Sequence, residues 1–157
     1  MPSIHNVIQA LQSLEFTRGF DLKQLEKLAA ISTYVTFSEG ATIFQEGDES
    51  DLVYLLVEGD VALTTKVPGH GQVTILTLGA GQLLGWSSLF IPKRKTAGAR
   101  TNAPSKAIAI NALELIELCK ADQAFGFTIM WQVADVISGR LRAAREQLLD
   151  MFEPARR

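Results

Sequence analysis

Apolar residues recur at helical spacing in two places near the N-terminus. The first pattern runs from Ser3 to Leu14 and predicts a short amphipathic helix that must pack on another element. Asp21 and Gln24 then form a capping-box pair ahead of a second pattern, which ends near Ala30. The sequence therefore predicts two N-terminal helices within residues 1–31, as part of the same domain as the strands that follow.

The pattern changes to short strand-like runs after Ser32. These runs are rich in β-branched and aromatic residues and are separated by glycine turns, which is typical of an antiparallel sandwich or barrel. A turn at Ala103-Pro104-Ser105 divides the last two runs, and the predicted barrel occupies residues 32–111. The predicted strands are Tyr34–Phe37, Ala41–Gln45, Leu52–Val57, Val61–Lys66, Val73–Leu78, Ala97–Thr101 and Lys106–Ile110.

Helical spacing returns in the C-terminal part, residues 112–157. Asn111 is the predicted cap of one helix, and Asp122 is the predicted cap of a long helix that continues to about Phe152. The apolar residues of the long helix alternate in steps of three and four, as in a heptad seam. Such a seam can pack on the barrel of its own chain, but its later half is too long for a small barrel. We therefore expect a two-fold dimer contact. The seam comprises Phe127, Met130, Ala134, Ile137, Leu141, Ala144, Leu148 and Met151, of which Phe127 and Met130 could instead pack on the barrel.

A glycine-rich stretch between Leu78 and Ala103 is the candidate ligand site. It consists of a turn, a short strand, a Gly85-Trp86-Ser87-Ser88 corner that opens one turn of helix, a basic loop with Arg94 and Lys95, and a strand from Thr96. Unpaired N–H groups at a helix start and nearby cations suit an anion such as a phosphate. The alternative is that the same corner is ordinary surface architecture.

Composition excludes several other classes of function. A formal net charge of −2 argues against a general affinity for nucleic acid, and the single cysteine, Cys119, excludes an internal disulfide or a cysteine cluster. The only histidines are His5 and His70, too few for a cupin-type metal site, and neither lies near Ser87 or Ser88 in the sequence. No apolar run has the length of a signal or a membrane span. We expect a cytoplasmic protein with no enzymatic activity, no metal, no resident cofactor and no membrane contact.

The glycine pattern between Phe37 and Leu63 resembles the cyclic-nucleotide-binding domain family. Gly40, Gly47 and Gly59 fall at the turns between strands as they do in that family. From about Phe16 to Phe152 the chain is similar to the sensor half of catabolite-activator and fumarate-nitrate-regulator type transcription factors. The resemblance implies a mainly β, α+β fold: an antiparallel jelly-roll barrel (double-stranded β-helix) with N-terminal helices and a long C-terminal dimerisation helix.

The resemblance also assigns a phosphate-binding cassette to residues 81–101. The family pattern, Gly-Glu-[Leu/Ile]-Ala-Leu and later Arg-[Ser/Thr/Ala]-Ala, matches Gly85 to Leu89 and Lys95-Thr96-Ala97. By this match Gly85 approaches the ribose, while Thr96 and Ala97 hold phosphate oxygens. Trp86 replaces the ribose-binding glutamate, and Lys95 replaces the phosphate-binding arginine. Lys95 keeps the attraction but loses the two-pronged geometry, and Trp86 either stacks on the ligand or fills the pocket.

Two further residues are assigned to the site by the resemblance. The long helix of the activator relatives closes over the base, and the matching positions here are Ala144 and Arg145. The DNA-binding relatives carry a winged helix-turn-helix after that helix, so we expect a stand-alone sensor without direct DNA binding. The sequence thus predicts a homodimeric regulatory module that binds a cyclic nucleotide or a related small anion. The alternative is a degenerate, ligand-free scaffold for dimerisation or for a protein partner.

Overall fold

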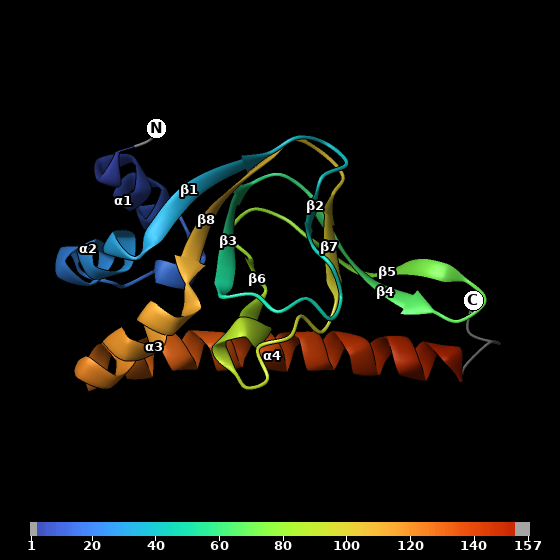
Figure 1. The fold of residues 1–157 in the computed structure, drawn as a ribbon. Coiled ribbons are helices and arrows are strands. Elements are labelled where there is room, and N and C mark those ends of the chain that lie inside the picture. Colours follow the sequence, from blue (N-terminus) through green and yellow to red (C-terminus); the bar gives the residue numbers. More distant parts are fainter. Residues whose placement is uncertain (1–2, 153–157) are drawn as a thin grey trace.

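Eight antiparallel strands in two sheets form the centre of the computed structural model, which describes residues 3–152 (Figure 1). One sheet has the order β1-β8-β3-β6 and the other β2-β7-β4-β5, which is the arrangement of an eight-stranded jelly roll. The strands are β1 (Ser32–Phe37), β2 (Thr42–Phe44), β3 (Leu52–Glu58), β4 (Val61–Val67), β5 (Gly71–Leu78), β6 (Leu83–Leu84), β7 (Gly98–Thr101) and β8 (Ser105–Asn111).

The two central strands of the first sheet, β3 and β8, are buried on both faces. Along β3, Val53 and Leu55 point to a core shared with the helices, whereas Tyr54 and Leu56 point to a core between the two sheets. Strand β8 repeats this alternation, because side chains of successive strand residues point to opposite faces. The near-continuous apolar runs in these strands are therefore explained by two cores that share one sheet.

Five helical elements outside the roll carry the helix-side core: α1 (Ile4–Gln12), the 3-10 turn η1 (Glu15–Thr17), α2 (Leu22–Ala30), α3 (Ala112–Ala121) and α4 (Gln123–Met151). The predicted caps are confirmed, since Asp21 and Gln24 form a full capping box and Asn111 accepts a bond from the N–H of Glu114.

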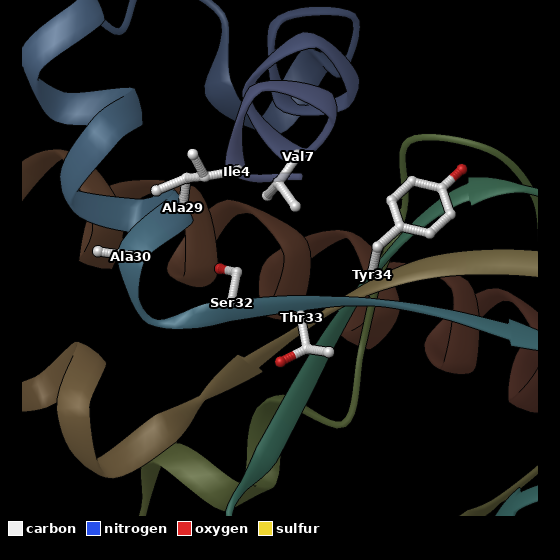
Figure 2. Close-up of a pocket in the computed structure, with 7 residues that line it drawn as sticks. All are labelled: Ile4, Val7, Ala29, Ala30, Ser32, Thr33 and Tyr34. Atoms are coloured by element: carbon white, nitrogen blue, oxygen red, sulfur yellow. The ribbon is translucent and has the colours of Figure 1, made fainter. Parts of the chain in front are cut away.

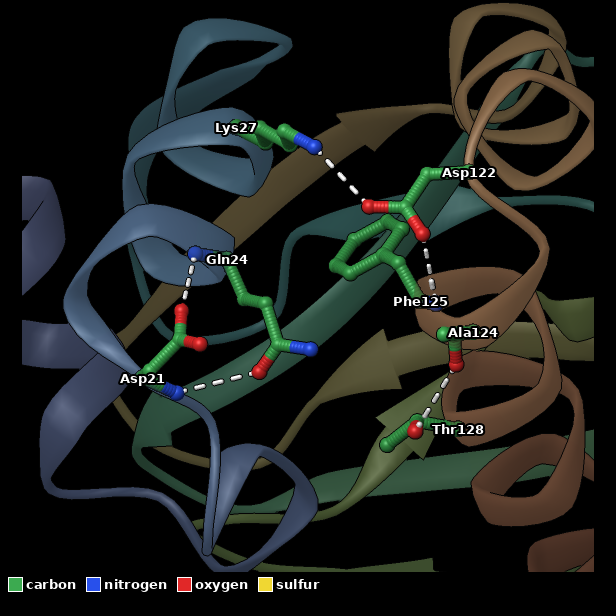
Figure 3. A network of polar contacts seen from close by, with 7 residues as sticks. All are labelled: Asp21, Gln24, Lys27, Asp122, Ala124, Phe125 and Thr128. Carbon is green, nitrogen blue, oxygen red and sulfur yellow. Dashed lines mark hydrogen bonds and ion pairs between the residues drawn. The ribbon is translucent and has the colours of Figure 1, made fainter.

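An ion pair joins the N-terminal helices to the start of α4 (Figure 3). Asp122 caps α4 by accepting a hydrogen bond from the N–H of Phe125, and its second oxygen lies 2.9 Å from the ammonium of Lys27 in α2. The hydrogen bond from Lys27 is the main cause of the lowered pKa of Asp122. One carboxylate thus both begins α4 and fixes it to α2.

The roll is not a closed barrel, because β5 and β6 are the outer strands of their sheets. Helix α4 runs beneath the sheets and contacts both of these edges (Figure 1). The guanidinium of Arg140 donates to the carbonyl of Leu83 in β6, and the side-chain amide of Gln147 donates to the carbonyl of Ile75 in β5 at 3.0 Å. Side chains of α4 therefore bond backbone carbonyls at the two sheet edges, where no further strand of the described residues pairs.

The strands and helices agree with the sequence prediction to within about two residues, and most of the predicted seam of α4 is exposed. Met130, as its alternative placement predicted, and Ile137 are partly buried and pack on the helix-side core. Phe127, the other candidate for packing on the roll, is 69% exposed, and Trp131, which was not predicted in the seam, is 65% exposed. Residues 153–157 of the predicted C-terminal part lie outside the described residues.

Candidate functional site

The predicted corner is present at the end of β6. Gly85 follows Leu84 with φ of 78°, in the left-handed region, and the 3-10 turn η2 (Trp86–Leu89) begins directly after it. A Cβ at Gly85 would lie 2.7 Å from Nζ of Lys95. Both the backbone conformation and the close approach of Lys95 therefore favour glycine at this position.

The side chain of Lys95 points into the corner and is only 2% exposed. Its ammonium donates to Ser88 Oγ at 2.6 Å, to the carbonyl of Leu52 at 2.7 Å and to the carbonyl of Gly85 at 2.9 Å. It also lies 4.7 Å from the centroid of the Phe44 ring, in cation–π geometry. Lys95 thereby ties β2, β3 and η2 together.

All of these partners of Lys95 are electrically neutral. Among the residues that the structure describes, no carboxylate forms an ion pair with the ammonium. Burial without a counter-charge lowers the pKa of Lys95 to about 8, because desolvation disfavours the charged form. The corner therefore holds a positive charge that the fold solvates but does not neutralise.

The other predicted cassette residues differ in burial, and of their side chains only that of Ser88 bonds the ammonium. Ser87 and Ser88 are buried, Thr96 is exposed and Ala97 is half-buried. Arg94, the other cation named in the basic loop, is exposed and is bonded to Glu49 at 3.1 Å and to the carbonyl of Gly47 at 3.2 Å. The positive charge at the corner thus belongs to Lys95 and not to Arg94.

Trp86 packs on the helix-side core and not on the core between the sheets. Its ring is half-buried and contacts Phe90 edge to face, with centroids 6.1 Å apart. An indole in this position fills space next to the helices and does not plug the interior of the roll. It supplies no carboxylate in place of the family's ribose-binding glutamate.

Helix α4 reaches the roll through Arg140, a residue that the sequence analysis did not select. Ala144 and Arg145, the predicted ligand cap, are both exposed. Arg140 is half-buried, and desolvation lowers its pKa to about 10. The signal was present in the sequence, because Arg140 continues the four-three-four spacing of Ile129, Val133 and Val136 on the inner face of α4.

Two hollows differ in chemical character. A pocket of about 270 Å³ between α1, α2 and β1 is lined by apolar and hydroxyl side chains without a charge, as Figure 2 shows: Ile4, Val7, Ala29, Ala30, Ser32, Thr33 and Tyr34. A larger cleft of about 650 Å³ lies where α4 crosses the open edge of the roll. Its walls include Glu15 and Arg18 from the η1 region, Leu83 from β6, and Asp135 and Arg140 from α4.

Two classes of site find no support between residues 3 and 152. No group of three or more potential ligands from His, Cys, Asp and Glu comes together there to hold a metal ion. None of the helices in this range combines the length and the apolar character that crossing a bilayer requires.

Comparison with known proteins identifies the family. The family model of the cyclic nucleotide-binding domain matches residues 34–122, which span β1 to the cap of α4. This match covers more than half of the chain and contains the corner and Lys95. The chain belongs to the cyclic nucleotide-binding domain family.

The related proteins are regulators. The chain is 30% identical over 125 residues to the cyclic AMP receptor protein of Thermus thermophilus, covering 76% of this chain and 54% of that protein. It is 26% identical over 118 residues to the CRP-like cAMP-activated global transcriptional regulator of Mycobacterium tuberculosis, covering 75% of this chain and 51% of that one. The chain thus spans about half the length of the curated relatives it matches.

A solved structure shows the same fold. The N-terminal domain of a transcriptional regulator from Streptomyces coelicolor A3(2) superimposes with a TM-score of 0.68 at 27% identity, covering 88% of this chain and 94% of that domain. The jelly roll with its helices is therefore also the fold of the N-terminal domain of that transcriptional regulator.

Proposed function

We propose that this chain is a ligand-sensing regulatory module, not an enzyme, and that it binds a cyclic nucleotide or a related small anion at the Gly85–Ala97 corner. The observation that carries the proposal is the ammonium of Lys95, buried at the corner with neutral partners only. A buried charge without a counter-charge is costly, and an incoming anion would offset that cost. The names of the relatives, a cyclic AMP receptor and a cAMP-activated regulator, support the ligand class.

The same geometry suggests a path from the corner to α4. Lys95 bonds the carbonyl of Gly85, and Arg140 bonds the carbonyl of Leu83 two residues earlier. An anion that draws Lys95 away from Gly85 would shift the end of β6, and with it the acceptor on which α4 is docked. Ligand occupancy would then change how α4 lies on the roll.

A second copy of the chain is the proposed partner of the exposed face of α4. Large apolar side chains lie along this face at heptad spacing, with exposures between 55% and 78%: Phe127, Trp131, Leu141, Leu148 and Phe152. An isolated soluble helix would not keep such a stripe in water without a partner. We propose a symmetric dimer, in which Arg145 would lie within the contact.

One observation favours the alternative of a ligand-free scaffold. The three acceptors of Lys95 already solvate its ammonium, so that a nucleotide must displace bonds that the fold has formed. In that case the corner is a rigid support for α4, and regulation would act through a protein partner.

A binding assay with matched variants separates the two functions. Purified protein is titrated with cyclic AMP, cyclic GMP and cyclic di-GMP, and binding is followed by calorimetry and by thermal shift. A ligand at about a hundred times its Kd should stabilise the fold by roughly 2.7 kcal/mol. The variant Lys95→Met should lose the response while Arg94→Met keeps it. A well-folded protein that binds none of the three nucleotides would leave the scaffold as the function.

A further inference from the structure

The cleft under α4 contains four charged side chains that do not pair with one another. Glu15 and Arg18 lie on the side of η1, and Asp135 and Arg140 lie on α4. Among the described residues none of the four forms an ion pair within 4.0 Å. Opposite charges that share a cleft without touching leave polar groups of both signs available to a third molecule.

Arg140 has donors to spare on this cleft. Among the described residues its one side-chain hydrogen bond runs from Nη2 to the carbonyl of Leu83, although a guanidinium carries five N–H donors. No buried side-chain nitrogen or oxygen within residues 3–152 lacks a partner, so the remaining guanidinium nitrogens of Arg140 reach solvent. Arg140 lines the cleft, so the remaining donors of its guanidinium can bind an anionic group of a ligand there.

Gly139 is a second, independent indication of a site. It lies in the interior of α4 and lines the same cleft, although glycine lowers helix stability. A Cβ at this position would have no atom of the described chain within 4 Å, so close packing does not explain the glycine. The missing side chain leaves open space directly beside Arg140.

We propose that this cleft is a second small-molecule site, separate from the Lys95 corner, and that it binds an amino-acid-type zwitterion. The carboxylate of the ligand would pair with Arg140, its ammonium would pair with Asp135, and its body would occupy the space above Gly139. A simple anion fits less well, because Glu15 and Asp135 would repel it. The volume of about 650 Å³ is within the range of small-molecule sites. Because the cleft is walled by both η1 and α4, an occupant would hold α4 against the roll.

The test uses the full chain and the twenty protein amino acids, added singly in a thermal-shift screen and confirmed by calorimetry. At least one amino acid should raise the Tm of the wild-type protein. Gly139→Met should abolish that shift by filling the open space, whereas Gly139→Ala should largely keep it. Asp135→Asn should weaken binding about tenfold, the effect of one lost charge-assisted bond. The des-amino carboxylate of the same ligand should bind more weakly by a similar factor.

Three results would overturn the site. They are the absence of a shift with all twenty amino acids, a shift that persists in Gly139→Met, and equal binding of the des-amino analogue. Lys95→Met distinguishes this proposal from the cyclic-nucleotide function, since it should abolish nucleotide binding but not amino-acid binding. Gly139→Met should have the opposite pattern.

Discussion

Lys95 and Arg140 are both cations withdrawn from water, but their surroundings differ. Lys95 is 2% exposed and has three neutral acceptors and an aromatic ring around its ammonium. Arg140 is half-buried, bonds one carbonyl and borders an open cleft. A buried cation can therefore use its donors to hold the fold together, as Lys95 does, or keep some of them available for a ligand, as Arg140 does. Reversing or removing each charge should therefore have very different consequences.

The largest effect is expected from Lys95→Glu. This change places a carboxylate against the carbonyls of Leu52 and Gly85, where only Ser88 can donate a bond. An uncompensated buried charge destabilises a fold by about 3–5 kcal/mol. Urea unfolding followed by circular dichroism measures the loss. Arg94→Glu, on the neighbouring but exposed side chain, should change stability by less than about 1 kcal/mol. Similar losses in both variants would mean that the ammonium of Lys95 is not held as described.

The pH dependence of stability should identify the same group. The pKa of Lys95 falls from 10.5 to about 8 on folding, so the unfolded chain binds more protons than the folded one above pH 8. Stability must therefore rise with pH in this window, by about 2 kcal/mol between pH 8 and pH 10. Denaturant midpoints at half-unit pH steps would show the rise, and Lys95→Met should remove it. A flat profile in the wild-type protein would contradict the burial of a charged Lys95. Anion binding at the corner should weaken over the same interval, because it requires the protonated form.

Arg140→Gln should have a smaller effect on stability. The variant loses a charge-assisted bond to Leu83, but it also relieves the desolvation that lowers the pKa of the guanidinium. The two contributions oppose each other, and a net loss of about 1 kcal/mol is expected. Hydrogen exchange of the β6 and α4 amides would localise the change to the contact between β6 and α4. Gln147→Ala, which removes the bond to Ile75 at the other edge, is the matched control.

The sequence was sufficient to predict the helices and strands, but it did not predict where particular side chains point. Capping residues such as Asp21, Asn111 and Asp122 act locally, and all three form the expected bonds. The corner at Gly85 was also predictable, because a left-handed glycine before a single helical turn has a local signature. The direction of Lys95 was not, since its burial depends on acceptors that β3 and η2 supply from distant parts of the chain.

The inner face of α4 was overlooked in the sequence. A three-four alternation fits two neighbouring faces of one helix, and the prediction followed only the outer one. The burial of Ile129 and Val133 identifies the face that packs on the helix-side core and turns Trp131 outward. Arg140 then falls on the inner face, where a charged residue was not expected because charged residues are seldom buried without a partner.

The smallest predicted effect tests why the cleft exists. Gly139→Ala should stabilise the protein by about 0.5–1 kcal/mol, because alanine is the better helix former and its Cβ would enter open space. Gly126, in the same helix, is the control. A Cβ there would lie 2.6 Å from the carbonyl oxygen of Cys119, so Gly126→Ala should destabilise the fold. Thermal unfolding should show a higher Tm for Gly139→Ala and a lower Tm for Gly126→Ala. If Gly139→Ala is destabilising as well, the glycine serves the packing of α4, and the open space beside Arg140 is not held for a ligand.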